Sequence, residues 1–282
     1  MRLKCPVCKT PLTEHLLCEN GHQFYKEDDV MMLMTPEFKS FLHGWLDSFE
    51  EYRSPYLKKL DFEHLPVSGL NNDFNIWSAR IQDINLIDKQ IEHSFKNVLE
   101  IGSWNGWLAN HLSKKGLEVI AIDYFTHELD GMKAKRFYSN PSWTSIQMDL
   151  EDLSIFDQPF DLIILNRCLA YFTDPINYLF QLQKLIKPGG KIIITGLNVK
   201  KNQMKERELI QSTIEFKSRY NKDLQFKNSK SYIDFNDLED MKKWGAKIAC
   251  YPGFKNRINS TFFKHKNVTY FGIYIHEKVK TY

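Results

Sequence analysis

The chain has 282 residues, of which 43% are hydrophobic, and it carries 38 basic and 35 acidic side chains. This length and apolar content suit one sizeable domain with its own core, plus an appendage. No apolar run approaches the length that spans a membrane, and the N-terminus lacks the apolar core of a signal peptide. We therefore expect a cytoplasmic protein without membrane contact.

The first 35 residues contain a cluster of candidate metal ligands. Cys5 and Cys8 are separated by two residues, nine residues follow, and Cys18 and His22 supply a second pair. Three thiolates and one imidazole form a closed tetrahedral set for structural Zn²⁺, with no position left for water. The alternative is a pair of cysteine turns without metal. We expect a zinc ribbon over residues 1–35, which is too small to fold on an apolar core alone.

Residues 36–94 are expected to form a helical linker or lid. Apolar residues recur at helical spacing between 37 and 53, which predicts an amphipathic helix whose aromatic stripe faces the core. Proline, glycine and asparagine residues predict a loop over 65–74. A second helix over 77–91 then leads to the first strand of the next unit.

The stretch 97–123, NVLEIGSWNGWLANHLSKKGLEVIAID, organises the rest of the chain. An apolar run suited to a buried strand precedes a turn with Gly102 and Gly106, a helix that ends near Gly116, and a second strand closed by Asp123. The two turn glycines let the backbone approach a ligand where a Cβ would collide, and Asp123 can accept both hydroxyls of a ribose. This layout is typical of nucleotide-type sites in doubly wound sheets.

Further strands alternate with helical patterns, which predicts an α/β fold. A helix is expected over 127–137. Strands are expected at 143–148, 160–165, 191–195, 246–250 and 268–276. The run 160–165 is almost wholly apolar and suits the centre of a parallel sheet, whereas the last strand alternates and should pair antiparallel.

The motif spacing resembles that of class I S-adenosylmethionine (SAM) dependent methyltransferases. Residues 100–106 read E-x-G-x-x-x-G, which differs from the G-x-G-x-x-G of dinucleotide sites and is similar to the family's first motif. The string LIKPGGKIIITG at 185–196 is similar to a later motif, above all in the subgroup acting on small molecules. The resemblance implies a Rossmann-like doubly wound sheet of seven strands with an antiparallel last strand. The expected domains are the ribbon at 1–35, the lid at 36–94, and a methyltransferase domain at 95–282 with an insertion at 197–231.

The resemblance also implies how the cofactor SAM would bind. Its amino-acid end would lie over the glycine turn, its carboxylate would meet Arg80, and its ribose would meet Asp123. Asp149 would bond the adenine amino group, next to the backbone of Leu150. The implied cofactor residues are Glu100, Gly102, Ser103, Trp104, Gly106, Asp123, Tyr124, Asp149, Leu150, Asn166 and Arg80. For Arg80 a surface role, and for Asp149 an ordinary place at a strand end, are the alternatives.

Methyl transfer from a sulfonium is an in-line displacement, so a base is needed only for acceptors such as a hydroxyl. We expect His127 or His265 to act as that base, with Tyr171 as an alternative, because histidine titrates near neutrality. Each of these side chains taken alone is more often a surface residue. An amine acceptor needs no protein base.

The substrate remains open between two classes. The subgroup resemblance implies a small-molecule acceptor: a sugar, a nucleotide-linked compound or a secondary metabolite. The alternative is ribosomal or transfer RNA, because the ribbon resembles that of ribosomal RNA guanine methyltransferases. Residues 199–282 also carry 18 basic against 9 acidic side chains, which suits an anionic substrate or lysines that only face solvent. A third reading is a partner-binding scaffold with a vestigial cofactor site.

Overall fold

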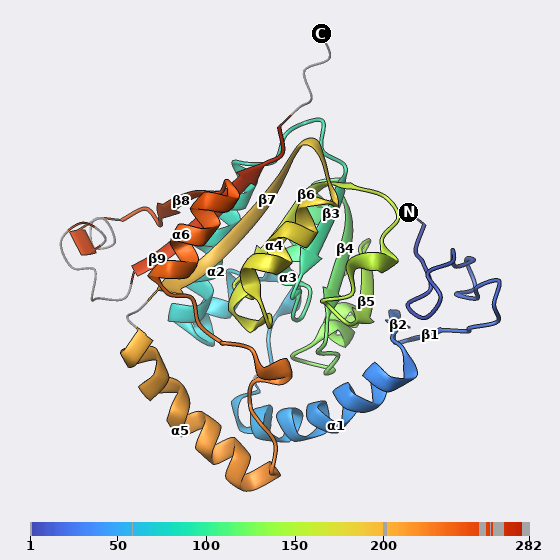
Figure 1. Cartoon of the computed structure of the whole chain (residues 1–282), viewed down its shortest axis with the longest axis horizontal. Helices are drawn as coiled ribbons and strands as arrows, with labels where there is room; N and C mark the ends of the chain where they lie inside the picture. The colour runs from blue at the N-terminus through green and yellow to red at the C-terminus, as the bar shows by residue number, and fades with distance from the viewer. Residues whose placement is uncertain are drawn as a thin grey trace.

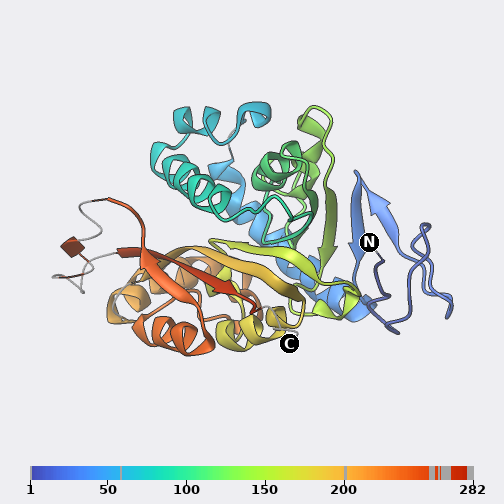
Figure 2. The same ribbon diagram turned by 90° about the horizontal axis from the view of Figure 1, so that it is seen from above.

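The computed structural model describes residues 2–57, 59–199, 202–253, 258–259, 261 and 268–277. These residues form a single mixed sheet with helices on both faces (Figures 1 and 2). Along the sheet the strands follow the order β1 (Tyr25–Glu27), β2 (Val30–Leu33), β5 (Thr144–Met148), β4 (Glu118–Asp123), β3 (Asn97–Ile101), β6 (Phe160–Asn166), β7 (Ile186–Val199), β9 (Val268–Ile275) and β8 (Lys247–Cys250).

The strand pairing confirms the predicted fold class. Strands β2 to β7 are parallel to their neighbours across the centre of the sheet, and β9 is antiparallel to both β7 and β8. The predicted seven strands are β3 to β9. Strand order reverses beside β3, and ligands bind at the carboxyl ends of strands at such a point.

The N-terminal segment extends this sheet. Strand β2 pairs in parallel with β5, placing Met31 beside Ile146, and β1 pairs antiparallel with β2. Cys5 and Cys18 belong to the same apolar cluster as Phe156, which follows β5. Strands from before and after residue 35 therefore belong to one sheet. The division into domains at residues 35 and 94 remains a prediction.

Helices cover the two faces in separate pairs. Helices α2 (Phe74–Asp88) and α3 (Trp107–Lys114) lie on one face, and α4 (Pro175–Gln183) and α6 (Phe235–Trp244) on the other (Figure 2). Strand β6 is buried on both sides, since Leu162 and Ile164 pack toward α2 and α3 while Ile163 and Leu165 pack the opposite way. Helices α1 (Pro36–Arg53) and α5 (Asn202–Tyr220) lie beyond one end of the strands (Figure 1).

Two elements differ from the prediction. The expected helix over 127–137 is a loop followed by a short 3₁₀ helix, Met132–Phe137. Gly131 is extended, and the His127 side chain accepts the backbone N–H groups of Leu129 and Asp130, which offers the chain an alternative to a helix. Strand β7 is longer than expected at both ends, because Ile186 also pairs with β6 across a register shift and residues 197–199 pair with β9. None of the described helices is long and apolar enough to cross a membrane.

Candidate cofactor and acceptor site

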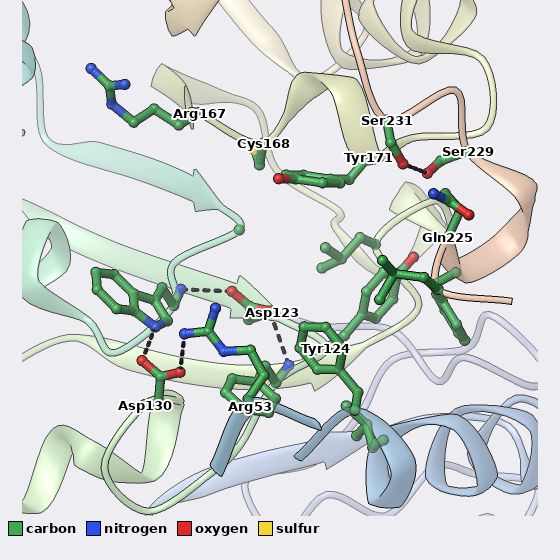
Figure 3. A pocket seen from close by; sticks show the side chains of 18 of the residues that line it. Arg53, Asp123, Tyr124, Asp130, Arg167, Cys168, Tyr171, Gln225, Ser229 and Ser231 are labelled. Atoms are coloured by element: carbon green, nitrogen blue, oxygen red, sulfur yellow. Dashed lines mark hydrogen bonds and ion pairs between the residues drawn. The ribbon is translucent and has the colours of Figure 1, made fainter. Parts of the chain in front are cut away.

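A pocket of about 710 Å³ lies at the carboxyl ends of β3, β4 and β6 (Figure 3). Helix α1, the start of α2 and the region after β7 cover it. Its wall on the sheet side is formed by Gly102, Trp104, Trp107, Asp123, Tyr124, Phe125, Asp130, Leu150, Asn166, Arg167, Cys168, Tyr171 and Phe172. The covering wall is formed by Trp45, Leu46, Phe49, Tyr52, Arg53, Ile76, Arg80, Ser212, Leu224, Gln225, Phe226, Ser229 and Ser231.

The glycine turn after β3 forms the floor of the pocket. Gly102 has φ +70°, and a Cβ there would lie 2.8 Å from the Cβ of Cys168. Gly106 has φ +79° and is packed against Trp143. Between them Trp104 also has a positive φ, +52°, which costs a residue with a side chain about 1–2 kcal/mol. The sequence therefore needs compensating contacts at Trp104.

Two carboxylates hold Trp104 in this conformation. Its backbone N–H donates to Oδ2 of Asp123 at 2.6 Å, and its indole Nε1 donates to Oδ1 of Asp130 at 2.7 Å. Oδ2 of Asp130 accepts from Nη2 of Arg53, the last residue of α1, at 2.5 Å. Asp130 thus ties the covering helix to the glycine turn (Figure 3). Sequence reasoning missed Asp130 and Arg53, because nothing local marks their partnership.

Asp123 is an acceptor on the pocket wall. Oδ1 accepts from the backbone N–H of Phe125 at 3.0 Å, and a carboxylate with these backbone donors still has capacity to accept further hydrogen bonds. Burial raises the pKa of Asp123. Its neighbour Glu100 is fully buried behind the turn, and burial together with Asp123 raises its pKa well above the usual range. Glu100, Ser103 and Gly106 lie behind the described pocket wall rather than on it.

Arg80 is a half-buried cation on the pocket wall. Its guanidinium lies 4.7 Å from the ring centre of Trp104 and 5.3 Å from that of Trp77. Nη1 donates to the carbonyl of Ile76 at 3.1 Å, whereas the buried Nε has no partner among the described residues. Burial, and then the charge of Arg167, lower the pKa of Arg80 to about 10. A carboxylate from a ligand would satisfy this group.

Asn166, at the end of β6, has a fixed amide. Nδ2 donates to Oδ2 of Asp83 at 3.1 Å and to Oγ1 of Thr195 at 2.7 Å. Since a carboxylate only accepts, the amide cannot be reversed, and Oδ1 remains as an acceptor on the pocket wall. Asp83, on α2, is fully buried and also accepts from Arg167 at 2.6 Å and from the hydroxyl of Tyr251. The sequence gives one signal for Asp83: it is an acidic residue on the buried face of a predicted helix.

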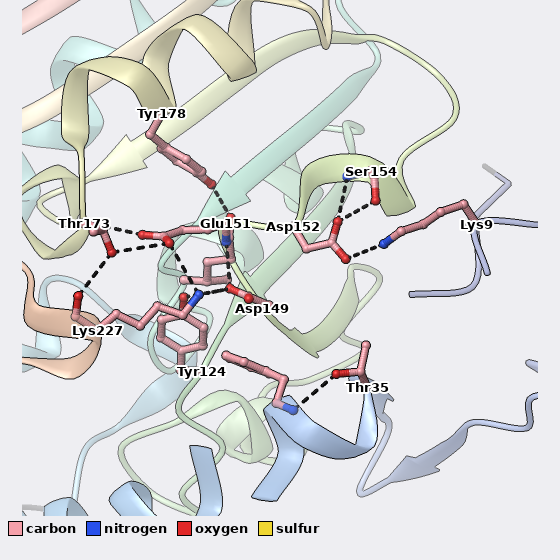
Figure 4. A network of polar contacts seen from close by, with 12 residues as sticks. Lys9, Thr35, Tyr124, Asp149, Glu151, Asp152, Ser154, Thr173, Tyr178 and Lys227 are labelled. Carbon is pink, nitrogen blue, oxygen red and sulfur yellow. Dashed lines mark hydrogen bonds and ion pairs between the residues drawn. The ribbon is translucent and has the colours of Figure 1, made fainter. Parts of the chain in front are cut away.

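Asp149 is already occupied by another part of the chain (Figure 4). Its Oδ1 accepts from Nζ of Lys227 at 2.6 Å and from the hydroxyl of Tyr124 at 3.3 Å. Lys227 lies in the predicted insertion and also reaches Glu151 at 3.4 Å. Asp149 is absent from the described pocket wall, whereas Leu150 and Tyr124 are part of it.

The candidate bases lie apart. Tyr171 is on the pocket wall. His127 is not among the described lining residues, and its Nδ1 accepts from Leu129 N at 3.1 Å and Asp130 N at 3.2 Å, so it stabilises a turn. His265 lies outside the described residues.

The four predicted zinc ligands come together in space. One ligand atom from each of Cys5, Cys8, Cys18 and His22 lies within 4.8 Å of all the others. The Sγ atoms of Cys8 and Cys18 are 3.6 Å apart, and Nδ1 of His22 is 3.6 Å from Cys5 Sγ and 3.3 Å from Cys18 Sγ. Backbone N–H groups of Val7, Cys8 and His22 point at the sulfurs.

Comparison with known proteins identifies the domain. Residues 73–237 match the methyltransferase domain family. A ubiquinone biosynthesis O-methyltransferase of Alkalilimnicola ehrlichii is 28% identical over 104 residues, 36% of this chain and 42% of that protein. The corresponding protein of Coxiella burnetii is 30% identical over 112 residues, 40% of this chain and 48% of that protein. The chain thus spans less than half the length of these curated relatives.

Among solved structures, the complex of the Haloferax volcanii Trm112 methyltransferase activator with a putative methyltransferase aligns with a TM-score of 0.48 and 12% identity, covering 78% of this chain and 99% of that one. The family match covers more than half of the chain and includes the glycine turn, β4, β5 and β6. The chain therefore belongs to the methyltransferase domain family.

Proposed function

We propose that this chain is a SAM-dependent methyltransferase that transfers the methyl group to oxygen or nitrogen of a small-molecule acceptor. The observation that carries the proposal is the covered pocket of about 710 Å³ between the glycine turn and helix α1. Small-molecule sites typically measure about 300–1,000 Å³ and are largely apolar. A covered pocket of this size suits a small compound better than a folded RNA. The O-methyltransferase relatives support the same class of acceptor.

We assign the cofactor to the sheet side of this pocket. Arg80 would bind its carboxylate, Oδ1 of Asn166 its ammonium group, and Asp123 its ribose hydroxyls. Each assignment rests on an unused donor or acceptor at the pocket wall. Tyr124 and Leu150 would flank the adenine, and Asp149 would need to share its carboxylate with Lys227. Gly102, Ser103, Trp104 and Gly106 would shape the turn under the amino-acid end, with Glu100 behind it.

The protein's part in the reaction is chiefly alignment. SAM carries an electrophilic methyl group on its sulfonium sulfur, and the thioether that remains is a good leaving group. Fixing the two reactants in line is worth on the order of 7 kcal/mol or more. Among the predicted bases, Tyr171 is the one on the described wall, and His127 would have to leave its turn to act. An amine acceptor would need neither.

We also propose that Cys5, Cys8, Cys18 and His22 bind one structural Zn²⁺. Zinc–sulfur bonds of about 2.3 Å and zinc–nitrogen bonds of about 2.0 Å in a tetrahedron place the ligand atoms about 3.5–3.8 Å apart. Three of the separations measure 3.3–3.6 Å, close to this range, and all four ligand atoms lie within 4.8 Å of one another. All four positions are filled by protein, so the ion would stabilise the ribbon against the sheet edge and take no part in methyl transfer.

The test of the proposed function is transfer of labelled methyl from SAM into an extract of the source organism, separated by size with and without RNase. Label in a low-mass, RNase-resistant fraction is expected. Label in a high-mass, RNase-sensitive fraction would contradict the small-molecule proposal and favour RNA. No incorporation by a protein that binds SAM, tried against extracts from several growth conditions, would favour the scaffold.

A further inference from the structure

We propose that the acceptor is an uncharged compound with a flat ring, and that this ring stacks on Tyr171. The inference rests on the proposed function and names the substrate class more narrowly. Two features of the pocket carry it: two of the three arginines on its described wall are paired within the protein, and the ring of Tyr171 packs against no other described ring.

Two of the three arginines on the described pocket wall form ion pairs within the protein. Arginines are the only cations among the described lining residues. Arg53 pairs with Asp130 at 2.5 Å, and Asp130 is itself 6% exposed. Arg167 pairs with the fully buried Asp83 at 2.6 Å. Breaking either pair would leave a buried carboxylate uncompensated, which is strongly unfavourable.

Arg80 is the remaining arginine, and it has no ion pair among the described residues. The carboxylate of the cofactor would pair with Arg80, since Arg80 lies over Trp104 in the glycine turn. With SAM bound, the described wall then offers no unpaired cation to a carboxylate, phosphate or sulfonate on the acceptor. An acceptor carrying such a group would lose its hydration without gaining a counter-ion. The excess of basic residues after residue 199 thus does not extend to this described wall.

Tyr171 supplies the ring contact. It ends the 3₁₀ helix Leu169–Tyr171 directly after β6, and its side chain is on the pocket wall although 64% exposed (Figure 3). No other described ring packs against it, and its hydroxyl makes no hydrogen bond within the described part of the chain. In contrast, Trp45 and Phe49 on the covering wall are already stacked on each other, with centroids 4.5 Å apart.

The position of Tyr171 suits an acceptor rather than the cofactor. It lies three residues beyond Cys168, which packs against Gly102 in the cofactor turn, and across the pocket from Tyr124 and Asp123 (Figure 3). Ser229 and Ser231 also line the pocket and carry neutral hydroxyls, and the backbone N–H of Ser231 donates to the carbonyl of Ala170, the residue before Tyr171. An aromatic face with neutral polar neighbours recognises a flat, hydroxylated or aminated ring without net charge.

The test uses the full-length protein saturated with S-adenosylhomocysteine and titrates two fluorescent probes, a naphthol and the corresponding naphthol sulfonate. These probes share a ring and a hydroxyl and differ by one negative charge. We expect the naphthol to bind at least about tenfold more tightly. Tyr171→Leu should weaken naphthol binding about tenfold, whereas Tyr171→Phe, which keeps the ring, should stay within about threefold of wild type.

Equal or tighter binding of the sulfonate, no binding of the naphthol, or equal affinities for the Leu and Phe variants would overturn the inference. S-Adenosylhomocysteine affinity is measured first in each variant, because it reports folding and the cofactor site. A wild-type protein that fails to bind it would remove the proposed function, and this inference with it. Intact cofactor binding with the wrong probe preference would remove the inference alone.

Discussion

The buried carboxylate of Asp83 determines which way the amide of Asn166 faces. Both Nδ2 hydrogens of Asn166 are used, one by Asp83 at 3.1 Å and one by Thr195 at 2.7 Å, so Oδ1 is left on the pocket wall. Asp83 comes from α2, 83 residues before Asn166 in the sequence. A helix outside the central stretch therefore prepares an acceptor beside the glycine turn.

Replacing Asp83 should weaken cofactor binding although Asp83 does not line the pocket. Asp83→Asn allows the amide of Asn166 to turn and leaves Arg167 without its counter-charge. We expect the Kd for SAM, measured by calorimetry, to rise about tenfold, since a hydrogen bond to a charged group contributes about 1.5–3 kcal/mol. Asp88→Asn is the matched control on the same helix, where Asp88 pairs at the surface with His111 and Lys115. Equal SAM affinities for the two variants would refute the role of Asp83.

Zinc content tests the N-terminal cluster. The purified chain should contain about one Zn²⁺, and the double variant Cys5→Ser with Cys8→Ser should lose it and unfold at a lower temperature. The destabilisation caused by zinc loss should extend beyond the ribbon, because Cys5 and Cys18 pack in the core cluster that includes Phe156. Cys250→Ser, outside the cluster, should retain the metal. A double variant that keeps its zinc would rule out this ligand set.

Lys227 should hold the region after β7 against the ends of β4 and β5. Its ammonium group contacts Asp149 at 2.6 Å and Glu151 at 3.4 Å, and the neighbouring Phe226 packs between Trp45 and Tyr124 with centroids 5.0 Å from each. Lys227→Met leaves two carboxylates facing each other, so amide hydrogens between 221 and 231 should exchange faster. Lys242→Met, which removes a surface pair on α6, should leave that exchange unchanged. Unaltered exchange in the Lys227 variant would show that Phe226 packing alone holds the segment.

Local sequence patterns predicted the central strand–turn–helix–strand unit and the N-terminal Cys/His cluster. Glu100, Gly102, Gly106 and Asp123 follow one another along a single strand–turn–helix–strand unit, whose elements the structure confirms. That these residues bind the cofactor stays a prediction. Likewise, Cys5, Cys8, Cys18 and His22 lie within 18 consecutive residues. Such features depend on neighbours in the sequence, which is the range over which periodicity and spacing carry information.

The rest depended on contacts between distant segments. The pairing of β2 with β5, the link from Arg53 through Asp130 to Trp104, and the contact of Lys227 with Asp149 join parts of the chain that no local pattern relates. His127 was expected in a helix, but its ring accepts nearby backbone N–H groups and stabilises a loop instead. No local pattern predicts the left-handed backbone conformation of Trp104, because this conformation depends on the carboxylates of Asp123 and Asp130.

The most direct test of the account is SAM binding by two glycine variants. A Cβ at Gly102 would lie 2.8 Å from Cys168 on the pocket floor, whereas Gly116 has a similar positive φ of +84° with nothing within 4 Å. Gly102→Val and Gly116→Ala therefore share backbone strain, and the Gly102 variant alone also fills the cofactor turn. Calorimetry should show SAM binding lost in Gly102→Val and retained in Gly116→Ala, with both proteins folded by circular dichroism. Undiminished SAM binding by folded Gly102→Val would show that the cofactor lies elsewhere.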